Sequence, residues 1–546
     1  MLGQMIKKPL LISGLIEHAV RFHGDTDVIS VETTGGIERT HWEKIGINAR
    51  RLASTLGKLG VEPGDRCGTI AWNNRRHLEI YFGVSGGGMV CHTLNPRLAP
   101  ETLVYVINHA KDKILFVDRT FLPLVANLAP KLETVRRVVV LGPRDAEVGA
   151  MLEGLMFYDE LLEAGDEAFK WPELDEMTAS SLCYTSGTTG HPKGVVYSHR
   201  STVLHSLVGC GPDAINIAAR DTVMPVVPMF HVNAWGVPYI AAMQGARLVL
   251  PGPQLDGPSL AQLIDTEQVT LALGVPTIWM GLLAALRDGS ATAASMKRTI
   301  VGGSALPPSM IAAFQDEFGI ELIHAWGMTE TSPLGTLNQL KSKHVGMDSA
   351  QLVELRKGQG RPPYGVELRI VGEDNMPLAN DGLTQGRLQI RGHWIVDTYF
   401  GMDAPALTPD GWFDTGDIAS LDAEGYLVIK DRAKDVIKSG GEWIASVELE
   451  NIAIAHPGIA NAAVIAAQHE KWDERPVVVA VKSPGSELDA AGLLAWFDGK
   501  VPAWQKPDAA FFVDALPVSG TGKVLKKELR EIYGAVLTGN PASCEA

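Results

Sequence analysis

The sequence predicts an α/β fold, and three observations support this prediction. Across most of the chain, short apolar runs typical of strands alternate with segments of helical periodicity, which is the pattern of βαβ units in parallel sheets. From about residue 360 the runs become shorter and turn signals separate them, which predicts a small antiparallel or barrel-like part. The 546 residues exceed the roughly 250–300 at which a single core stops growing, so we expect at least two domains.

The elements of the first part follow one another in a simple order. The apolar runs expected as strands are Arg66–Ala71, Lys113–Val117, Arg137–Leu141, Arg247–Leu250 and Leu271–Val275, and Arg75–Phe82 is expected as a helix. Continuous apolar runs of this length indicate strands that are covered on both faces, as in parallel sheets. The shorter strands of the next part are expected at Gly386–Arg391 and Tyr426–Lys430.

A domain boundary is predicted near Asp431–Lys434. The residues after it predict a compact α+β unit, with expected helices and strands at Ser446–Ala455, Ala462–Ala467, Pro476–Lys482 and Leu488–Asp498 and a basic C-terminal helix. We therefore expect domains over 1–431 and 432–546.

The composition limits the classes of function. The formal net charge is −15, from 48 Lys+Arg and 63 Asp+Glu, which argues against binding to nucleic acid or to an anionic membrane. The five cysteines show no zinc-type spacing and suit a reducing compartment. No apolar run approaches the ~18 residues of a membrane span. We expect a soluble, cytoplasmic protein.

The strongest motif is the segment Tyr184–Gly194, which reads YTSGTTGHPKG. Its glycines, hydroxyl residues and Lys193 predict a loop that surrounds phosphate oxygens with backbone N–H groups, hydroxyls and an ammonium. It is not a Walker A loop, because His191-Pro192 precede the lysine. A second phosphate-like loop, Pro517–Lys523, is by itself more typical of a solvated hairpin.

Three further segments lie between these two loops. Gly302–Ala305 allows a flat ring to approach the backbone closely, and Ala325–Thr331 combines an aromatic side chain, hydroxyls and a carboxylate. Gly411–Asp417 ends a tight turn on a carboxylate that suits the two hydroxyls of a ribose. Taken singly, each segment is a weak indication.

In this order and together with Asp431–Asp435, the motifs resemble those of the adenylate-forming superfamily, which contains acyl-CoA synthetases, peptide-synthetase adenylation domains and beetle luciferases. The resemblance covers essentially the whole chain. Within the superfamily the chain is similar to short- and medium-chain fatty acyl-CoA ligases that carry the Thr93–Leu98 sequence TLNPRL, and most of all to ligases of 3-methylmercaptopropionate. One departure is Arg387, where relatives usually have glutamate, which puts a local salt bridge in doubt.

The resemblance implies an architecture and a reaction. The expected N-terminal domain has two αβαβα-type sheets and a small barrel-like subdomain, and a small mobile α+β domain follows, with its hinge at Lys434. The substrates are a carboxylic acid, ATP and coenzyme A, and Mg²⁺ is the cofactor. An acyl-adenylate and pyrophosphate form first, and the thiol of coenzyme A then displaces AMP. No carrier domain is expected after the ligase unit, and a homodimer is expected.

The resemblance also assigns roles to residues. Lys523 is expected to contact the substrate carboxylate and the α-phosphate, Thr329 the α-phosphate, and Glu330 the Mg²⁺ together with Thr185. The residues expected to bind ATP or AMP lie in the motifs above: Thr185, Ser186, Gly187, Thr188, Thr189, Gly190, Lys193, Gly303, Ser304, Ala305, Ala325, Trp326, Gly327, Met328, Asp417 and Arg432. The residues expected to bind coenzyme A are consecutive: Lys438, Ser439, Gly440, Gly441, Glu442 and Trp443.

The expected acid pocket consists of His231, Trp235, Gly302 and Pro333, and its bulky side chains suggest a cavity for few carbons. We therefore expect 3-methylmercaptopropionate and other short- or medium-chain fatty acids as substrates, with a general medium-chain acyl-CoA ligase as the alternative.

Two other classes of function are weighed against the ligase. Gly83–Gly87 fits the GxSxG pattern of serine hydrolases, with Ser85 as the nucleophile, but no helix start follows the serine and no oxyanion motif precedes it. A non-catalytic nucleotide-binding module would have no need for Lys523, Glu330 and Asp417 together.

Overall fold

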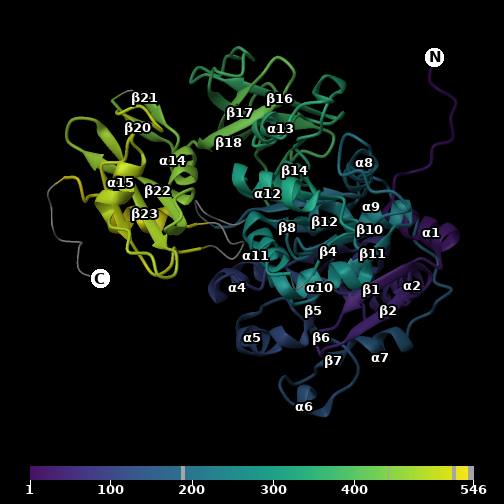
Figure 1. Ribbon diagram of the computed structural model, residues 1–546. Helices are drawn as coiled ribbons and strands as arrows, with labels where there is room; N and C mark the ends of the chain where they lie inside the picture. Colours follow the sequence, from purple (N-terminus) through teal and green to yellow (C-terminus); the bar gives the residue numbers. More distant parts are fainter. Residues whose placement is uncertain (186–190, 290, 441, 519–523, 539–546) are drawn as a thin grey trace.

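The computed structural model describes residues 1–185, 191–289, 291–440, 442–518 and 524–538. Two large sheets form the body, a four-stranded sheet lies at one end of it, and a separate sheet with its own helices forms the C-terminal part (Figure 1). The chain therefore has the α/β body and the small α+β C-terminal part that the sequence predicts.

The first large sheet has seven strands, and all but the last are parallel to their neighbours. In spatial order they are β7 (Met156–Phe157), β6 (Arg137–Leu141), β5 (Asp112–Asp118), β3 (Arg66–Ile70), β4 (Val90–Thr93), β8 (Ala179–Tyr184) and β9 (Gly194–Ser198). The phosphate-loop motif joins β8 to the antiparallel β9, at the carboxyl end of the parallel strands.

The second large sheet has eight strands, and its two edge strands are antiparallel. In spatial order they are β15 (Thr336–Leu337), β14 (Glu321–Trp326), β13 (Arg298–Val301), β12 (Leu271–Gly274), β10 (Thr222–Pro225), β11 (Arg247–Leu250), β1 (Asp27–Val31) and β2 (Ile37–His41).

Helices cover both sheets in five layers. A shared core holds one group of helices between the two sheets: α1 (Ile12–His23), α2 (Trp42–Lys58), α3 (Arg75–Gly86), α8 (His199–Gly209) and α9 (Val237–Gln244). The outer face of the seven-stranded sheet is covered by α4 (Pro100–Ala110) and α5 (Leu122–Leu128). The outer face of the eight-stranded sheet is covered by α10 (Gly257–Glu267), α11 (Pro276–Arg287) and α12 (Pro308–Phe318). This is the αβαβα arrangement that the resemblance implies.

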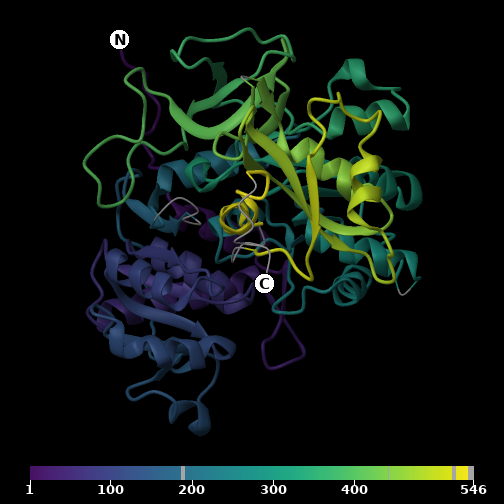
Figure 2. The same ribbon diagram turned by 90° about the vertical axis from the view of Figure 1, so that its left-hand side faces the viewer.

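Short helices complete the body at its surface: α6 (Ala146–Gly149), α7 (Tyr158–Glu163) and α13 (Ser349–Arg356). The part expected to be barrel-like is a four-stranded antiparallel sheet in linear order: β16 (Val366–Val371), β17 (Gly386–Gly392), β18 (Phe413–Leu421) and β19 (Leu427–Arg432). It lies above the body in Figure 2.

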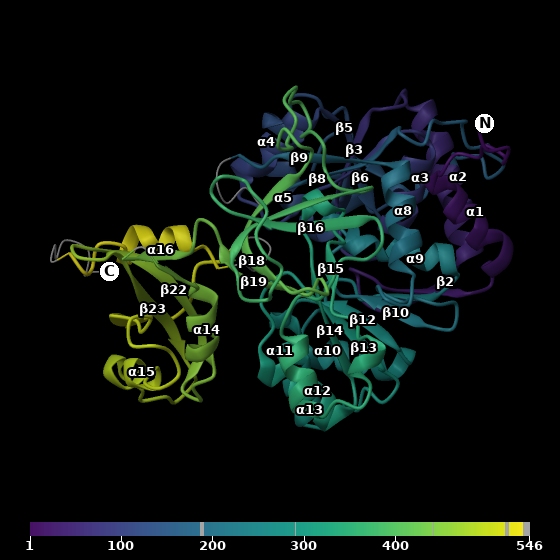
Figure 3. The same ribbon diagram turned by 90° about the horizontal axis from the view of Figure 1, so that it is seen from above.

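The C-terminal part is a five-stranded sheet with helices on both faces. Its strands are β20 (Ile437–Ser439), β21 (Glu442–Ile444), β22 (Ile459–His469), β23 (Asp473–Lys482) and β24 (Ala509–Phe512). One core joins the sheet to α14 (Ser446–Ile454) and α15 (Ala490–Trp496), and a second core joins its other face to α16 (Lys526–Tyr533). Figure 3 shows this part beside the body, next to β18 and β19.

Candidate active site

A cavity of about 600 Å³ lies where loops of both large sheets meet the four-stranded sheet. Thr185, Val227, Val275, Gly302 and Gly327 line it, and each follows a strand of one of the large sheets. In open α/β sheets, ligands bind outside the carboxyl ends of the strands, which is where these loops converge. The position of the cavity therefore follows from the topology.

Most of the described residues of the expected site line this cavity. They come from segments far apart in the sequence: Thr185, Lys193, His231, Trp235, Gly302, Gly303, Ser304, Ala325, Trp326, Gly327, Met328, Thr329, Glu330, Pro333, Arg432 and Lys434. Ser186, Gly187, Thr188, Thr189, Gly190, Gly441 and Lys523 lie outside the described residues. Val524, which follows Lys523, lines the cavity from the C-terminal part.

The two ends of the phosphate-loop motif are held together. The backbone N–H of Thr185 donates to the carbonyl of Lys193 at 2.9 Å, and the N–H of Lys193 donates to Thr185 Oγ1 at 3.1 Å. The ammonium of Lys193 lies over the ring of Tyr399, 4.7 Å from its centre. One cation and one hydroxyl are thus fixed at the base of the loop, where phosphate oxygens would be bound.

Glu330 places a buried carboxylate in the cavity wall, close enough to Lys193 for their charges to interact. The hydroxyl of Tyr399 donates to Glu330 Oε1 at 2.8 Å, and Val396 N–H donates to the Glu330 carbonyl at 2.8 Å. Burial raises the pKa of Glu330 above its ordinary value, although the Tyr399 hydrogen bond, Arg432 and Lys193 oppose this effect. Next to it, the carbonyl of Thr329 accepts a hydrogen bond from the hydroxyl of Tyr197 at 2.6 Å.

Asp417 is buried at the edge of the cavity and is joined to it through Arg432. Arg432 Nε lies 3.0 Å from Asp417 Oδ1, and the two residues are register partners on β18 and β19. In the same turn, Arg387 NH1 lies 3.0 Å from Asp414 Oδ2, so this arginine forms a local salt bridge of its own. Two residues expected to bind the nucleotide, Asp417 and Ala305, do not line the cavity.

Two glycines set the shape of the cavity wall because no side chain fits there. A Cβ on Gly302 would lie 3.0 Å from the carbonyl oxygen of Ala325 and 3.2 Å from the indole of Trp235. A Cβ on Gly327 would lie 1.5 Å from the carbonyl oxygen of Pro333. The Trp235 ring therefore packs against bare backbone, between the nucleotide motifs and the expected acid side.

Trp235 is carried by an unusual backbone. The five successive residues Val232–Gly236 all have positive φ, between 46° and 76°. Left-handed backbone costs roughly 1–2 kcal/mol per non-glycine residue. Contacts with surrounding residues must therefore stabilise this turn. Asn233 anchors it by donating to Ser181 Oγ at 3.0 Å and accepting from Cys183 Sγ at 3.5 Å.

The lining of the cavity is more apolar than polar. Its aliphatic residues come from β13, β15 and the segments after α8, β10 and β12 and before β15: Ile215, Val227, Val275, Ile300, Leu334 and Leu337. His231 and His205 add polar groups to this lining. Sequence reasoning missed His205 and Tyr399, since neither lies in a motif and only the folded chain brings them to the cavity.

The segment expected to bind coenzyme A lies elsewhere. Lys438 and Ser439 lie on β20, Glu442 and Trp443 lie on β21, and these two strands pair in the C-terminal sheet. Lys438 N–H donates to Glu474 Oε2 at 2.7 Å, and Gly440 N–H donates to the Trp472 carbonyl at 2.9 Å. Ser439 Oγ accepts from Arg475 at 3.2 Å. Of this segment's described residues, including Glu442 and Trp443, none lines the cavity.

The serine-hydrolase alternative is wrong. Ser85 lies inside α3 with no exposed surface, and its hydroxyl donates to the Ser180 carbonyl at 2.8 Å. A nucleophile buried in a helix cannot reach an ester.

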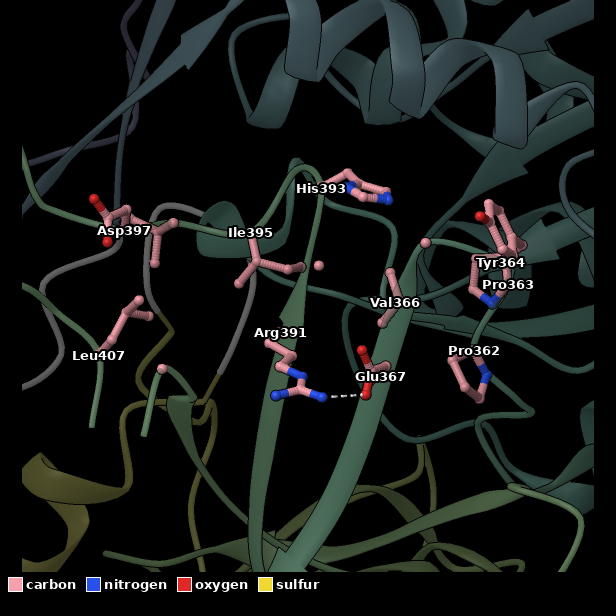
Figure 4. A pocket seen from close by; sticks show the side chains of 14 residues that line it. Pro362, Pro363, Tyr364, Val366, Glu367, Arg391, His393, Ile395, Asp397 and Leu407 are labelled. Atoms are coloured by element: carbon pink, nitrogen blue, oxygen red, sulfur yellow. Dashed lines mark hydrogen bonds and ion pairs between the residues drawn. The ribbon is translucent and has the colours of Figure 1, made fainter. Parts of the chain in front are cut away.

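A second cavity, of about 640 Å³, lies on the four-stranded sheet (Figure 4). It is lined by the start of β16, the end of β17 and the loops beside them, including Tyr364 and His393, with an Arg391–Glu367 ion pair of 2.7 Å in its wall. None of the described residues expected in the site lines it. The two volumes are similar, so the chemistry of the lining, and not the size, identifies the first cavity as the site.

Metal-ligand clusters and membrane-spanning helices are both absent from the described residues. No group of three or more His, Cys, Asp or Glu side chains is placed to hold a metal ion there. None of the helices in these parts of the chain is long and apolar enough to cross a membrane.

The fold and the cavity define a nucleotide-dependent enzyme of the adenylate-forming class. Residues 16–400 match the AMP-binding enzyme family, and residues 448–523 match the AMP-binding enzyme C-terminal domain. The chain belongs to the AMP-binding enzyme family, and it is an acid–thiol ligase.

Individual relatives match over nearly their whole length. The chain is 61% identical to a 3-methylmercaptopropionyl-CoA ligase of Ruegeria pomeroyi, over 99% of this chain and 100% of the relative. It is 56% identical to a medium-chain-fatty-acid–CoA ligase of Ectopseudomonas oleovorans, over 100% of both chains. The crystal structure of the anthranilate CoA ligase AuaEII with anthranoyl-AMP has the same fold, with a TM-score of 0.85 at 22% identity, covering 96% of this chain and 98% of that one.

Proposed function

We propose that the protein is an ATP-dependent acid–CoA ligase that acts on 3-methylmercaptopropionate and other short- or medium-chain fatty acids. The observation that carries this proposal is one continuous cavity. Lys193, Thr329 and Glu330 line it together with Trp235 and a set of aliphatic residues. A carboxylic acid and the α-phosphate of ATP could therefore meet in a single enclosure.

In the first half-reaction, an oxygen of the substrate carboxylate attacks the α-phosphorus and pyrophosphate leaves. Negative charge gathers around the α-phosphate, so cations and fixed donors stabilise the transition state. Lys193 and the loop that it closes would hold the outer phosphates, Thr329 would contact the α-phosphate, and Lys523 would contact both reacting groups. Asp417 and Arg432, already paired with each other, would hold the ribose.

The donor set fits Mg²⁺. This ion keeps several waters and is usually held by one or two carboxylates together with substrate phosphates. The buried carboxylate of Glu330, which lies near Lys193, meets that description, and Thr185 would be a further oxygen ligand. Bound Mg²⁺ would neutralise phosphate charge, and the residues of the chain would orient the reactants.

In the second half-reaction, the thiol of coenzyme A attacks the acyl carbon and AMP leaves. The expected coenzyme A segment, Lys438–Trp443, lies away from the cavity while Val524 faces it. This arrangement suits the adenylating step, so we propose that the domain after Lys434 turns about that residue before the thiol reacts. Lys434 and Asp435 themselves line the cavity, as a hinge next to the nucleotide would.

The proposed acid rests on two supports. The 61% identical relative is named for 3-methylmercaptopropionyl-CoA, and the acid side of the cavity is bounded by Trp235 and aliphatic residues. The 56% identical relative supports a general medium-chain ligase as the second candidate. One methylene in an apolar pocket changes the free energy of binding by only about 1–3 kcal/mol, so we expect several acids to react.

The test is pyrophosphate release that depends on both ATP and coenzyme A, measured with straight-chain acids from three to twelve carbons and with 3-methylmercaptopropionate. We expect the highest kcat/KM among short acids. A preference for long-chain or aromatic acids would refute the proposed acid, and release without a carboxylic acid would refute the ligase. We also propose a homodimer in the cytoplasm, to be checked by sedimentation and by fractionation of cells.

A further inference from the structure

One polar side chain of the acid side has no hydrogen-bonding partner within the described chain. His205 projects from the middle of α8, is 2% exposed and lines the cavity. Its Nε2 is buried, and no described residue forms a hydrogen bond with it. In folded proteins, most buried polar atoms are paired, so each exception calls for a physical explanation.

Packing holds the ring in place where hydrogen bonds do not. A Cβ on Gly236 would lie 2.7 Å from His205 Cε1 and 2.8 Å from Nδ1, so this glycine leaves room for the imidazole. On another side, the ring of Trp394 meets it edge-on, with centroids 6.0 Å apart. Gly236 is the last residue of the left-handed turn that contains Trp235. The same turn therefore positions the Trp235 side chain and leaves room for the His205 ring.

An imidazole fixed in this way is a neutral donor at ordinary pH. Burial lowers the pKa of His205 to about 4. A neutral imidazole carries one N–H donor and one acceptor nitrogen. Leaving such a group unpaired is unfavourable, and a purely apolar residue at this position would avoid that cost. A ligand with a matching atom would remove that cost when it binds.

We propose that His205 determines specificity by donating its N–H to an acceptor atom in the tail of the acid. The cavity that His205 lines also has aliphatic residues in its wall, so a hydrocarbon tail would satisfy them and leave the imidazole unpaired. A thioether sulfur or ether oxygen one bond beyond the two methylenes next to the carboxyl group supplies the acceptor. The inference rests on the proposed function, because it concerns the acid of that reaction.

Three acids of equal length test it: 3-methylmercaptopropionate, 3-methoxypropionate and pentanoate, which differ only in having S, O or CH₂ at one position. A neutral hydrogen bond contributes roughly 0.5–1.5 kcal/mol, so we expect the native protein to favour the sulfur acid over pentanoate by about two- to tenfold in kcat/KM. Equal kcat/KM values for these two acids in the native protein would overturn the proposal without any variant.

Substitutions separate donation from packing. His205→Phe keeps a ring of similar size without the donor, so we expect kcat/KM to fall for the sulfur and oxygen acids and to stay level or rise for pentanoate. His205→Gln keeps a donor and should retain part of the preference. A parallel loss with all three acids would instead indicate a purely structural histidine.

The matched control is His199→Gln in the same helix. His199 is also buried with an unpaired Nε2, but its Nδ1 accepts from Ile12 N–H at 3.1 Å, and it does not line the cavity. We expect lower stability and an unchanged ratio between the acids. If none of the three acids reacts in the native protein, the proposed function fails and this inference fails with it, whereas reaction without discrimination refutes the inference alone.

Discussion

Asp431 caps the helix that begins at Ser446. The carboxylate of Asp431, at the end of β19, accepts from the backbone N–H of Ser446 at 2.6 Å and also from its hydroxyl. Lys526, the first residue of α16, donates to Ser446 Oγ at 2.6 Å and pairs with Glu450 at 2.7 Å. A buried polar network thus joins the last strand of the body to two helices of the C-terminal part.

We expect Lys526→Met to weaken this junction. The substitution removes the cation from a buried group of two carboxylates, and breaking a buried ion pair costs about 3–5 kcal/mol. Unfolding in urea should show that loss in the transition of the C-terminal part. The control is Lys527→Met on the exposed face of the same helix, which should change the free energy of unfolding by at most ~0.5 kcal/mol. Equal effects of the two changes would contradict the prediction.

Lys523→Ala should abolish adenylate formation and leave the fold intact. The expected reason is the loss of the cation that faces the substrate carboxylate and the α-phosphate as charge develops there. Pyrophosphate release and the unfolding midpoint would be measured together. Lys527→Ala is the control, because its side chain is exposed and 3.8 Å from Glu531. Native rates of pyrophosphate release in the Lys523 variant would refute its role.

Tyr399→Phe should move the acid limb of the pH–rate profile to higher pH. The hydrogen bond from Tyr399 lowers the pKa of Glu330, a pKa that burial raises. Without that bond the carboxylate takes up a proton at higher pH, and only the ionised form would bind Mg²⁺. The profile of kcat/KM for ATP reports this pKa. Tyr426→Phe loses a hydroxyl bonded to the Gln339 carbonyl at 2.9 Å and should leave the limb where it is.

Gly327→Ala should reduce both stability and activity. Its Cβ would lie 1.5 Å from the Pro333 carbonyl oxygen, so the cavity wall would have to move, at a cost of roughly 1–3 kcal/mol. Gly281→Ala in α11 is the control, since its Cβ would meet nothing nearer than 3.6 Å. The control should be neutral or more stable by up to ~1 kcal/mol, because alanine favours helices. Thermal melting and the rate of pyrophosphate release measure both effects.

Local patterns predicted much of the fold. Arg137–Leu141 and Arg247–Leu250 are strands with the expected bounds, because a continuous apolar run needs no distant information to be recognised. The strand Ala509–Phe512 was missed, since four residues without a turn signal give little periodicity. The helix expected at Leu488–Asp498 is shorter, at Ala490–Trp496, because Asp489 caps its start.

Some residues of the candidate site could also be predicted from local sequence patterns, and others could not. Residues of continuous motifs, such as Thr329 and Glu330, could be named from the sequence and line the cavity. Tyr399 and His205 could not, because their positions depend on contacts between segments far apart in the chain. The left-handed turn was also beyond sequence reasoning, since only Gly236 among its residues commonly signals positive φ. The roles of Lys523 and Lys438–Trp443 stay predictions.

The left-handed turn at Val232–Gly236 also bears on how this enzyme could acquire new substrates. Few amino acids tolerate five successive positive φ angles, so a library that randomises these positions should consist mostly of misfolded proteins. Ile215, Ile300 and Leu334 lie in ordinary backbone around the same space, and exchanges among aliphatic residues there leave the chain path unchanged. Directed evolution towards longer or branched acids should therefore enrich changes at these flanking positions and leave the turn as it is.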